Sequence, residues 1–187
     1  MANVDAPRGL VPRRHKNGAP YSGACNRYYV AAGESNNIFI GDPVSLTGAA
    51  DAAGIPTVAQ STAGDAIVGV VVGFENLTSD NLSKTYRPAS TEGYLLVADD
   101  PDLEYVIQSD GSYAATNAGL NGDIIVGTGN TALGTSAVEL DQSTVASTNT
   151  LALRILGAEI REDNEIGANT DVRVMINLHP HRQITGA

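Results

Sequence analysis

The sequence lacks the features on which several classes of protein depend. Cys25 is its only cysteine, so no disulfide can form within the chain and a bridge-stapled secreted scaffold is excluded. We expect this thiol to be a small, buried or partly buried apolar group. Residues 1–20 hold no apolar stretch typical of a secretory signal, and the longest apolar run, 66–74, is far shorter than a membrane-spanning helix. We therefore expect a protein made in the cytoplasm, with no membrane partner.

Helix-forming stretches are also absent. The chain has two lysines and no tryptophan but 20 glycines, and no window of about 12 residues carries the i, i+3, i+4, i+7 apolar pattern of a helix. Short β-rich runs alternate instead with turn dipeptides such as Gly41-Asp42 and Asn121-Gly122. This pattern predicts an all-β fold, a β-barrel or a jelly-roll-like sandwich. The predicted strands are 28–31, 37–40, 43–47, 56–59, 66–74, 94–98, 103–108, 123–126, 137–140, 150–156 and 171–178.

Two consecutive segments in the middle of the chain differ sharply in polarity. Residues 66–74 are apolar on both faces, which indicates a central strand covered on each side, with Gly69 and Gly73 as candidate bulges. Residues 75–91 are polar and predict a long loop or a short helix. No composition shift marks a second globular domain.

Charge is divided unevenly along the chain. Residues 1–27 hold five basic residues and one acidic residue, a net +4, whereas residues 28–187 carry −14. The first segment also contains Pro7, Pro12 and Pro20 and shows no hydrophobic period, which is typical of an extended segment without a core of its own. We therefore expect an extended basic N-terminal arm, residues 1–27, followed by a single all-β domain, residues 28–187.

The arm is expected to become ordered against a neighbouring chain. Ordering about 25 residues costs on the order of 25–50 kcal/mol, and surface ion pairs at about 0–1 kcal/mol each do not offset that cost. The arm must therefore bury apolar side chains or pair with the edge of a neighbour's sheet, while its arginines select an acidic protein surface. Nucleic acid is disfavoured as a partner because the acidic body would repel it. The expected contact residues are Arg8, Leu10, Val11, Arg13, Arg14, Lys16, Tyr21 and Arg27.

No motif predicts catalysis, a cofactor or a bound metal. Gly127–Gly134 has the glycines of a phosphate loop, but a strand-like run follows it, which favours a hairpin. His179 and His181 lack the further ligands that zinc requires, so we expect them to contact solvent or an interface. The run 99–102 holds three aspartates without the glycine and glutamate of a calcium loop and predicts an acidic turn.

Four stretches carry a family resemblance. They are Arg161-Glu-Asp-Asn-Glu-Ile-Gly167, Asp171-Val-Arg-Val-Met-Ile-Asn-Leu-His179, Ile40-Gly-Asp-Pro-Val-Ser-Leu46 and Gly64-Asp-Ala-Ile-Val-Gly-Val-Val-Val-Gly-Phe74. Together they cover about a quarter of the chain and resemble small structural proteins of tailed phages that are encoded near the major capsid protein. The basic arm matches no motif of that group.

The resemblance implies a head decoration, or cement, protein. Such a protein is a non-enzymatic all-β subunit of the virion that binds the outer surface of the head and stabilises contacts between major capsid protein subunits. It implies assembly in the host cytoplasm, with the major capsid protein as partner, and a homo-oligomer, with a trimer favoured over a dimer. On this interpretation, deleting residues 1–27 should leave a folded, oligomeric body that binds capsids poorly.

Two other classes of function compete with this interpretation. A sugar- or receptor-binding β module on the virion surface normally displays exposed aromatic side chains, and aromatics make up only 5% of this chain. A hydrolase using dispersed acids such as Asp99, Asp100 and Glu104 would need two carboxyl groups at a defined separation in a cleft. Finding the protein in a fixed ratio to a shell protein in purified particles would separate the decoration role from both.

Overall fold

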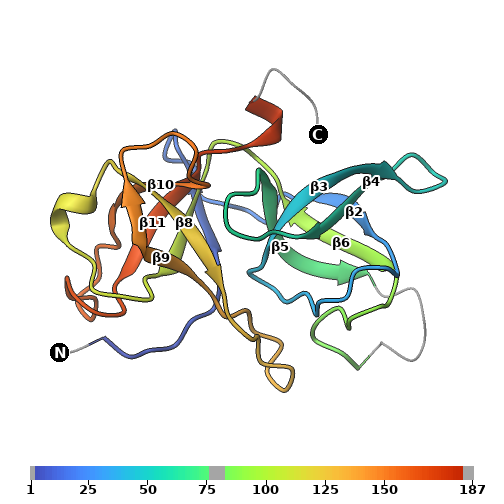
Figure 1. Cartoon of the computed structure of the whole chain (residues 1–187), viewed down its shortest axis with the longest axis horizontal. Helices are drawn as coiled ribbons and strands as arrows, with labels where there is room; N and C mark the ends of the chain where they lie inside the picture. Colours follow the sequence, from blue (N-terminus) through green and yellow to red (C-terminus); the bar gives the residue numbers. More distant parts are fainter. Residues whose placement is uncertain (1–2, 76–82, 183–187) are drawn as a thin grey trace.

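The computed structural model describes residues 3–75 and 83–182, and nearly all of their regular structure is β (Figure 1). The all-β prediction is therefore confirmed. The described residues include no helix long and apolar enough to cross a membrane. The strands are β1 (Val11–His15), β2 (Asn26–Val30), β3 (Pro43–Ala50), β4 (Pro56–Gln60), β5 (Ile67–Glu75), β6 (Gly93–Ala98), β7 (Leu103–Gln108), β8 (Asn121–Val126), β9 (Val138–Ala146), β10 (Leu153–Ala158) and β11 (Asp171–Ile176), with two short 3-10 helices, η2 (Ala115–Asn117) and η3 (Pro180–Arg182).

The strands form two sheets that lie side by side in Figure 1. The first is a closed barrel in the order β2-β4-β3-β5-β6, which lies on the right of the view. The second is a six-stranded sheet in the order β1-β7-β11-β10-β8-β9. A bridge between Ser109 and Leu140 joins the last strand, β9, to the segment that follows β7, so this sheet curls back on itself.

The N-terminal segment is part of the six-stranded sheet, so the arm expectation must be corrected. β1 pairs antiparallel with β7, from Val11 opposite Val106 to His15 opposite Leu103. Leu10 is completely buried in the core of the same chain. The barrel strands, residues 26–98, are thus inserted between the first strand of this sheet and the rest of it.

The proline that suggested an arm is compatible with this strand. β1 is an edge strand, and proline is accepted at a sheet edge because one row of backbone groups there has no ladder partner. Pro12 lies opposite Tyr105. The ordering cost is therefore offset within the chain itself, by the β7 ladder and by burial of Leu10, and ordering these residues requires no neighbouring chain.

The two sheets share a hydrophobic core. The larger cluster combines residues of the six-stranded sheet with Ile67 and Val70 of β5 and with Ala98 of β6. Val68 and Val71 of β5 instead point into the barrel's own cluster. β5 is therefore the central strand that the apolar run 66–74 predicted. Its pairing register shifts beside Gly69 and Gly73, as bulges at those glycines would require.

Gly9 and Gly41 allow the backbone of the N-terminal segment to lie in direct contact with the backbone at the edge of the barrel. The Leu10 N–H donates to the carbonyl of Gly41 at 2.9 Å. Gly9 and Gly41 have φ of +71° and +95°, and a Cβ atom on Gly41 would lie 2.4 Å from the carbonyl oxygen of Arg8. Because this Cβ would meet backbone atoms, no side-chain movement could relieve the clash.

Gly41→Ala is therefore expected to destabilise the protein by about 3–5 kcal/mol. Gly54→Ala is the matched control, because Gly54 has a similar φ of +82° but nothing within 4 Å of its missing Cβ. This control should lose only about 1–2 kcal/mol, the cost of the left-handed backbone. Urea unfolding of both variants measures the difference, and equal losses would contradict a tight crossing.

Three smaller expectations differ from the structure or fall outside it. Residues 37–40 make only isolated bridges, Ile38 with Arg87 and Ile40 with Thr135, and do not form a full strand. Cys25 is exposed, because it lies in the connection between β1 and β2 and not in a strand. Of the predicted loop or short helix at 75–91, residues 76–82 lie outside the described residues, and residues 83–91 form turns and an isolated bridge at Arg87, without a helix.

Candidate interaction site beside strand β1

Side-chain alternation places charged residues on the outer face of the six-stranded sheet. Leu103, Tyr105 and Ile107 of β7 belong to the core, so Glu104 between them points outward. Arg14 of β1 lies opposite Glu104, and Arg173 of β11 lies on the other side of β7 opposite Val106. Neighbouring strands thus bring basic and acidic side chains together on one face.

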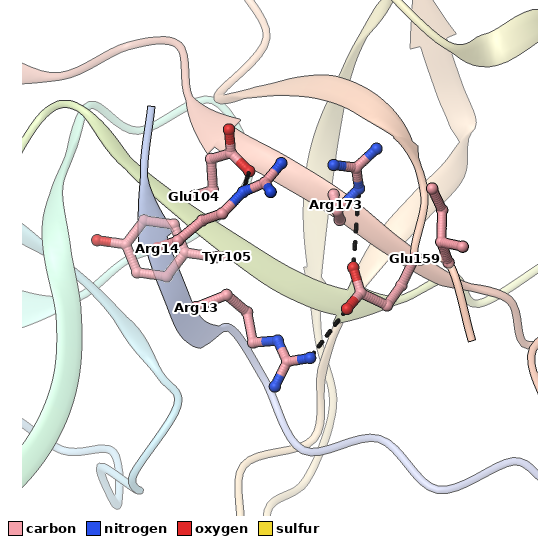
Figure 2. A pocket seen from close by; sticks show the side chains of 7 residues that line it. Arg13, Arg14, Glu104, Tyr105, Glu159 and Arg173 are labelled. Carbon is pink, nitrogen blue, oxygen red and sulfur yellow. Dashed lines mark hydrogen bonds and ion pairs between the residues drawn. The ribbon is translucent and has the colours of Figure 1, made fainter. Parts of the chain in front are cut away.

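A cleft of about 320 Å³ opens at this position. Figure 2 shows that its arginines come from β1 and β11 and that Glu159, which follows β10, reaches between them. We call it the arginine cleft. It is lined by Arg13, Arg14, Glu104, Tyr105, Glu159, Ile160 and Arg173.

Two of the three arginines make close ion pairs. Arg13 donates to Glu159 at 2.9 Å and Arg14 to Glu104 at 2.7 Å. The hydrogen bond from Arg14 to Glu104 raises the pKa of the Arg14 guanidinium. Both carboxylates are largely buried, whereas Arg13 and Arg14 are about half exposed.

The third arginine is different. Arg173 pairs with Glu159 only at 3.7 Å, beyond hydrogen-bond distance. Its Nε is buried and has no hydrogen-bond partner within the part of the chain that the structure describes. Glu159 is therefore shared between Arg13 and Arg173, and three guanidinium groups face two carboxylates in the cleft.

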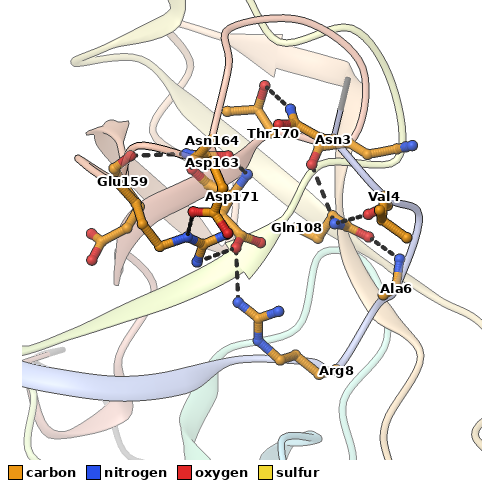
Figure 3. A network of polar contacts seen from close by, with 12 residues as sticks. Asn3, Val4, Ala6, Arg8, Gln108, Glu159, Asp163, Asn164, Thr170 and Asp171 are labelled. Atoms are coloured by element: carbon orange, nitrogen blue, oxygen red, sulfur yellow. Dashed lines mark hydrogen bonds and ion pairs between the residues drawn. The ribbon is translucent and has the colours of Figure 1, made fainter. Parts of the chain in front are cut away.

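A polar network next to the cleft fixes residues 3–8 (Figure 3). Asp171 is almost fully buried, and its Oδ2 accepts hydrogen bonds from Arg8 at 2.8 Å and from Arg161 at 2.9 Å. The side chain of Asn3 donates to the carbonyl of Glu165 at 2.7 Å. Residues 3–8 are thereby held against the connection between β10 and β11.

The structure separates the residues predicted as a contact surface. Arg13 and Arg14 line the arginine cleft, Arg8 pairs with Asp171, and Leu10 lies in the core. Val11 is half-buried in β1, and Tyr21 packs against the core. Lys16 is exposed, and its backbone N–H donates to the carbonyl of Asp102. Arg27 lies on the barrel, 2.8 Å from Glu75 and over the Tyr94 ring. Contact of any of them with a neighbouring chain stays a prediction.

Sequence reasoning missed Arg173, Glu104 and Glu159 as members of one site. The alternation in β7 and β11 places Glu104 and Arg173 on outward faces. It does not indicate that β7 lies between β1 and β11, and that strand order is what gathers the cleft.

Comparison with protein-family models, curated protein sequences and solved structures gave no match. The site is therefore interpreted from its own chemistry. No group of three or more His, Cys, Asp or Glu side chains arranged to hold a metal ion occurs among the described residues.

The remaining motifs have structural partners. Gly127–Gly134 lies in the β8–β9 connection, where Asn130 and Thr135 form a bridge, so the predicted hairpin is confirmed. The aspartates of the run 99–102 are each held by a neighbour: Asp99 accepts from Asn26 and Tyr28, Asp100 pairs with His15, and Asp102 pairs with Arg182.

The expectation for the two C-terminal histidines must be corrected in part. Their rings lie 5.1 Å apart. His181 is exposed, but His179 is completely buried and does not contact solvent. His179 lies between β11 and η3, next to Leu178, whose carbonyl accepts the backbone N–H of Ile67 in β5 at 2.9 Å.

Proposed function

We propose that this protein is a decoration, or cement, protein of a tailed-phage head. It binds the outer surface of the capsid and stabilises contacts between major capsid protein subunits. An all-β scaffold of two sheets that share a hydrophobic core suits a structural role, and the four phage-like stretches of the sequence support the same assignment.

The observation that carries the proposal is the position of the exposed large apolar side chains. Six large apolar side chains are exposed among the described residues, and three of them lie in or beside the β10–β11 connection: Ile160 is 90% exposed, Ile166 53% and Val4 77%, whereas Ile40, Ile125 and Leu133 lie elsewhere. Ile160 and Ile166 belong to the β10–β11 connection, and Val4 follows Asn3, which hydrogen-bonds to that connection. Exposed apolar groups that gather in one region are typical of a protein interaction site. One of the phage-like stretches lies in this same connection.

Such a surface stabilises a shell by linkage. A ligand that binds only the closed, expanded lattice favours that state by mass action. Homo-oligomerisation would add avidity, since each further subunit docks at a high effective concentration. The strongly acidic residues 28–187, with a net charge of −14, disfavour nucleic acid as a partner.

The purified full chain is therefore expected to co-sediment with expanded empty shells of the major capsid protein, in a fixed ratio to the shell subunits. Unexpanded shells are the control and should retain little of it. The absence of co-sedimentation at micromolar protein concentration would contradict the proposal.

One observation favours a sugar-binding module as the second candidate. A separate cleft of about 480 Å³ between the barrel and the β8–β9 hairpin has a largely neutral polar lining, the kind of surface that sugar hydroxyls bind. Its polar residues include Ser35, Asn36, Asn37, Gln60, Thr128 and Thr131. Glycan-array binding that Asn36→Ala abolishes, without shell binding, would favour this candidate.

A further inference from the structure

The guanidinium of Arg173 has more donors than acceptors around it. Arginine carries five N–H donors, yet among the described residues Arg173 pairs with one carboxylate, that of Glu159, at 3.7 Å. No hydrogen bond reaches the buried Nε from any described residue. The side chain as a whole is 24% exposed although Nε is buried, so part of it lines the cleft and remains accessible from outside.

The neighbouring residues do not supply the missing acceptor. Glu159 is already engaged by Arg13 at 2.9 Å, and Glu104 by Arg14 at 2.7 Å. The cleft therefore carries one positive charge in excess, in a chain whose total is −10. One further carboxylate would complete the alternation of charges and give Arg173 a planar, bidentate partner.

The rim of the cleft adds an apolar contact. Ile160, which is 90% exposed, directly follows Glu159 and lines the cleft. A volume of about 320 Å³ admits a side chain but not a helix or strand. The charge excess of one and the adjacent isoleucine fit a single acidic side chain on an otherwise apolar or neutral protein surface. A polyanion would be repelled by the acidic residues 28–187.

We propose that the arginine cleft docks one aspartate or glutamate side chain of the major capsid protein, with Ile160 packing beside it. This inference rests on the proposed function and deepens it by naming the contact. Arg173 supplies the bidentate hydrogen bonds, while Arg13 and Arg14 engage the two resident carboxylates at 2.9 and 2.7 Å, closer than the 3.7 Å between Arg173 and Glu159.

Quantitative co-sedimentation of the full chain with expanded empty shells tests the inference. Arg173→Gln should raise the dissociation constant about 10- to 100-fold, the loss expected for hydrogen bonds to a charged partner. Ile160→Ser should raise it about tenfold. Arg173→Lys, which keeps the charge without the fork, should fall between the wild type and Arg173→Gln.

Arg154→Gln is the matched control. Arg154 lies on β10 of the same sheet and bonds Asn121, but it does not line the cleft. This variant should bind shells like the wild type, and thermal melting should show that all variants fold. Equal binding by Arg173→Gln and wild type would overturn the docking site while leaving the decoration role intact. A wild-type protein that does not bind shells would overturn both.

Discussion

Leu10→Ala is expected to lower the free energy of unfolding by about 2–5 kcal/mol, the range for a buried leucine replaced by alanine. Leu10 is 0% exposed and packs with residues from both sheets, so the cavity would lie where the sheets meet. Val4→Ala is the control on the same segment, because Val4 is 77% exposed, and it should change stability by less than about 0.5 kcal/mol. Urea denaturation followed by circular dichroism measures both.

Removal of residues 1–15 should have a still larger effect. It deletes β1 and exposes one edge of β7, together with the core surface that Leu10 covers. We therefore expect the truncated protein to lose cooperative unfolding or to aggregate. This result would replace the sequence-based expectation that a protein without its first 27 residues stays folded. An unchanged unfolding midpoint for either variant would instead restore a separable arm.

The second large effect is a loss of stability in mild acid caused by His179. Burial, followed by the charges of His181 and Arg182, lowers the pKa of His179 to about 4. In the unfolded chain an imidazole takes up its proton near pH 6.5. Between these values the unfolded state binds more protons, so this contribution to stability is complete above about pH 6.5 and is lost as the pH falls towards 4.

The geometry gives the same direction. Nδ1 of His179 accepts the backbone N–H of His181 at 3.2 Å, and protonation of Nδ1 would remove that acceptor. The loss over the whole interval should be roughly 2–3 kcal/mol. In His179→Gln this loss of stability between pH 6.5 and 4 should disappear. His15→Gln is the control, at the partly exposed histidine paired with Asp100, and it should retain the loss.

The comparison must be made as a difference between variants. Burial raises the pKa of Asp42 and of Asp123, and acids of this kind favour folding as the pH falls, the opposite sign to His179. Subtracting the His179→Gln stability curve from that of the wild type removes their contribution. A flat difference curve between pH 4 and 6.5 would contradict the assignment to His179.

Regular alternation and turn chemistry were sufficient to predict most of the strands. β5 was recognised as central because both of its faces are apolar, and the structure places one face in each core cluster. β1 was missed because Val11–His15 contains a proline and two arginines, so it has no apolar face of its own to mark it as a strand. Its pairing with β7 depends on an edge that lies about 90 residues away in sequence.

For the candidate site, the sequence predicts only how the charged residues are distributed along the chain. The sequence indicates that arginines concentrate near the N-terminus and that carboxylates follow later. It does not indicate that Arg13, Arg14 and Arg173 meet Glu104 and Glu159 around one cleft. Long-range pairing decides this, because ion pairs at a surface are too weak to select a topology and instead form where the strand order brings charges together.

By itself, the sequence determined that the chain is all-β, where most of its strands begin and end, and that one strand is covered on both faces, since these properties depend on side-chain period and local turn preferences. Tertiary structure alone decided that the N-terminal residues complete the second sheet, that Leu10 lies in a shared core, and that Arg173 faces a cleft short of one carboxylate. The physical reason is that hydrophobic burial and ladder hydrogen bonds between distant segments fix the strand order, and that order sets which side chains become neighbours.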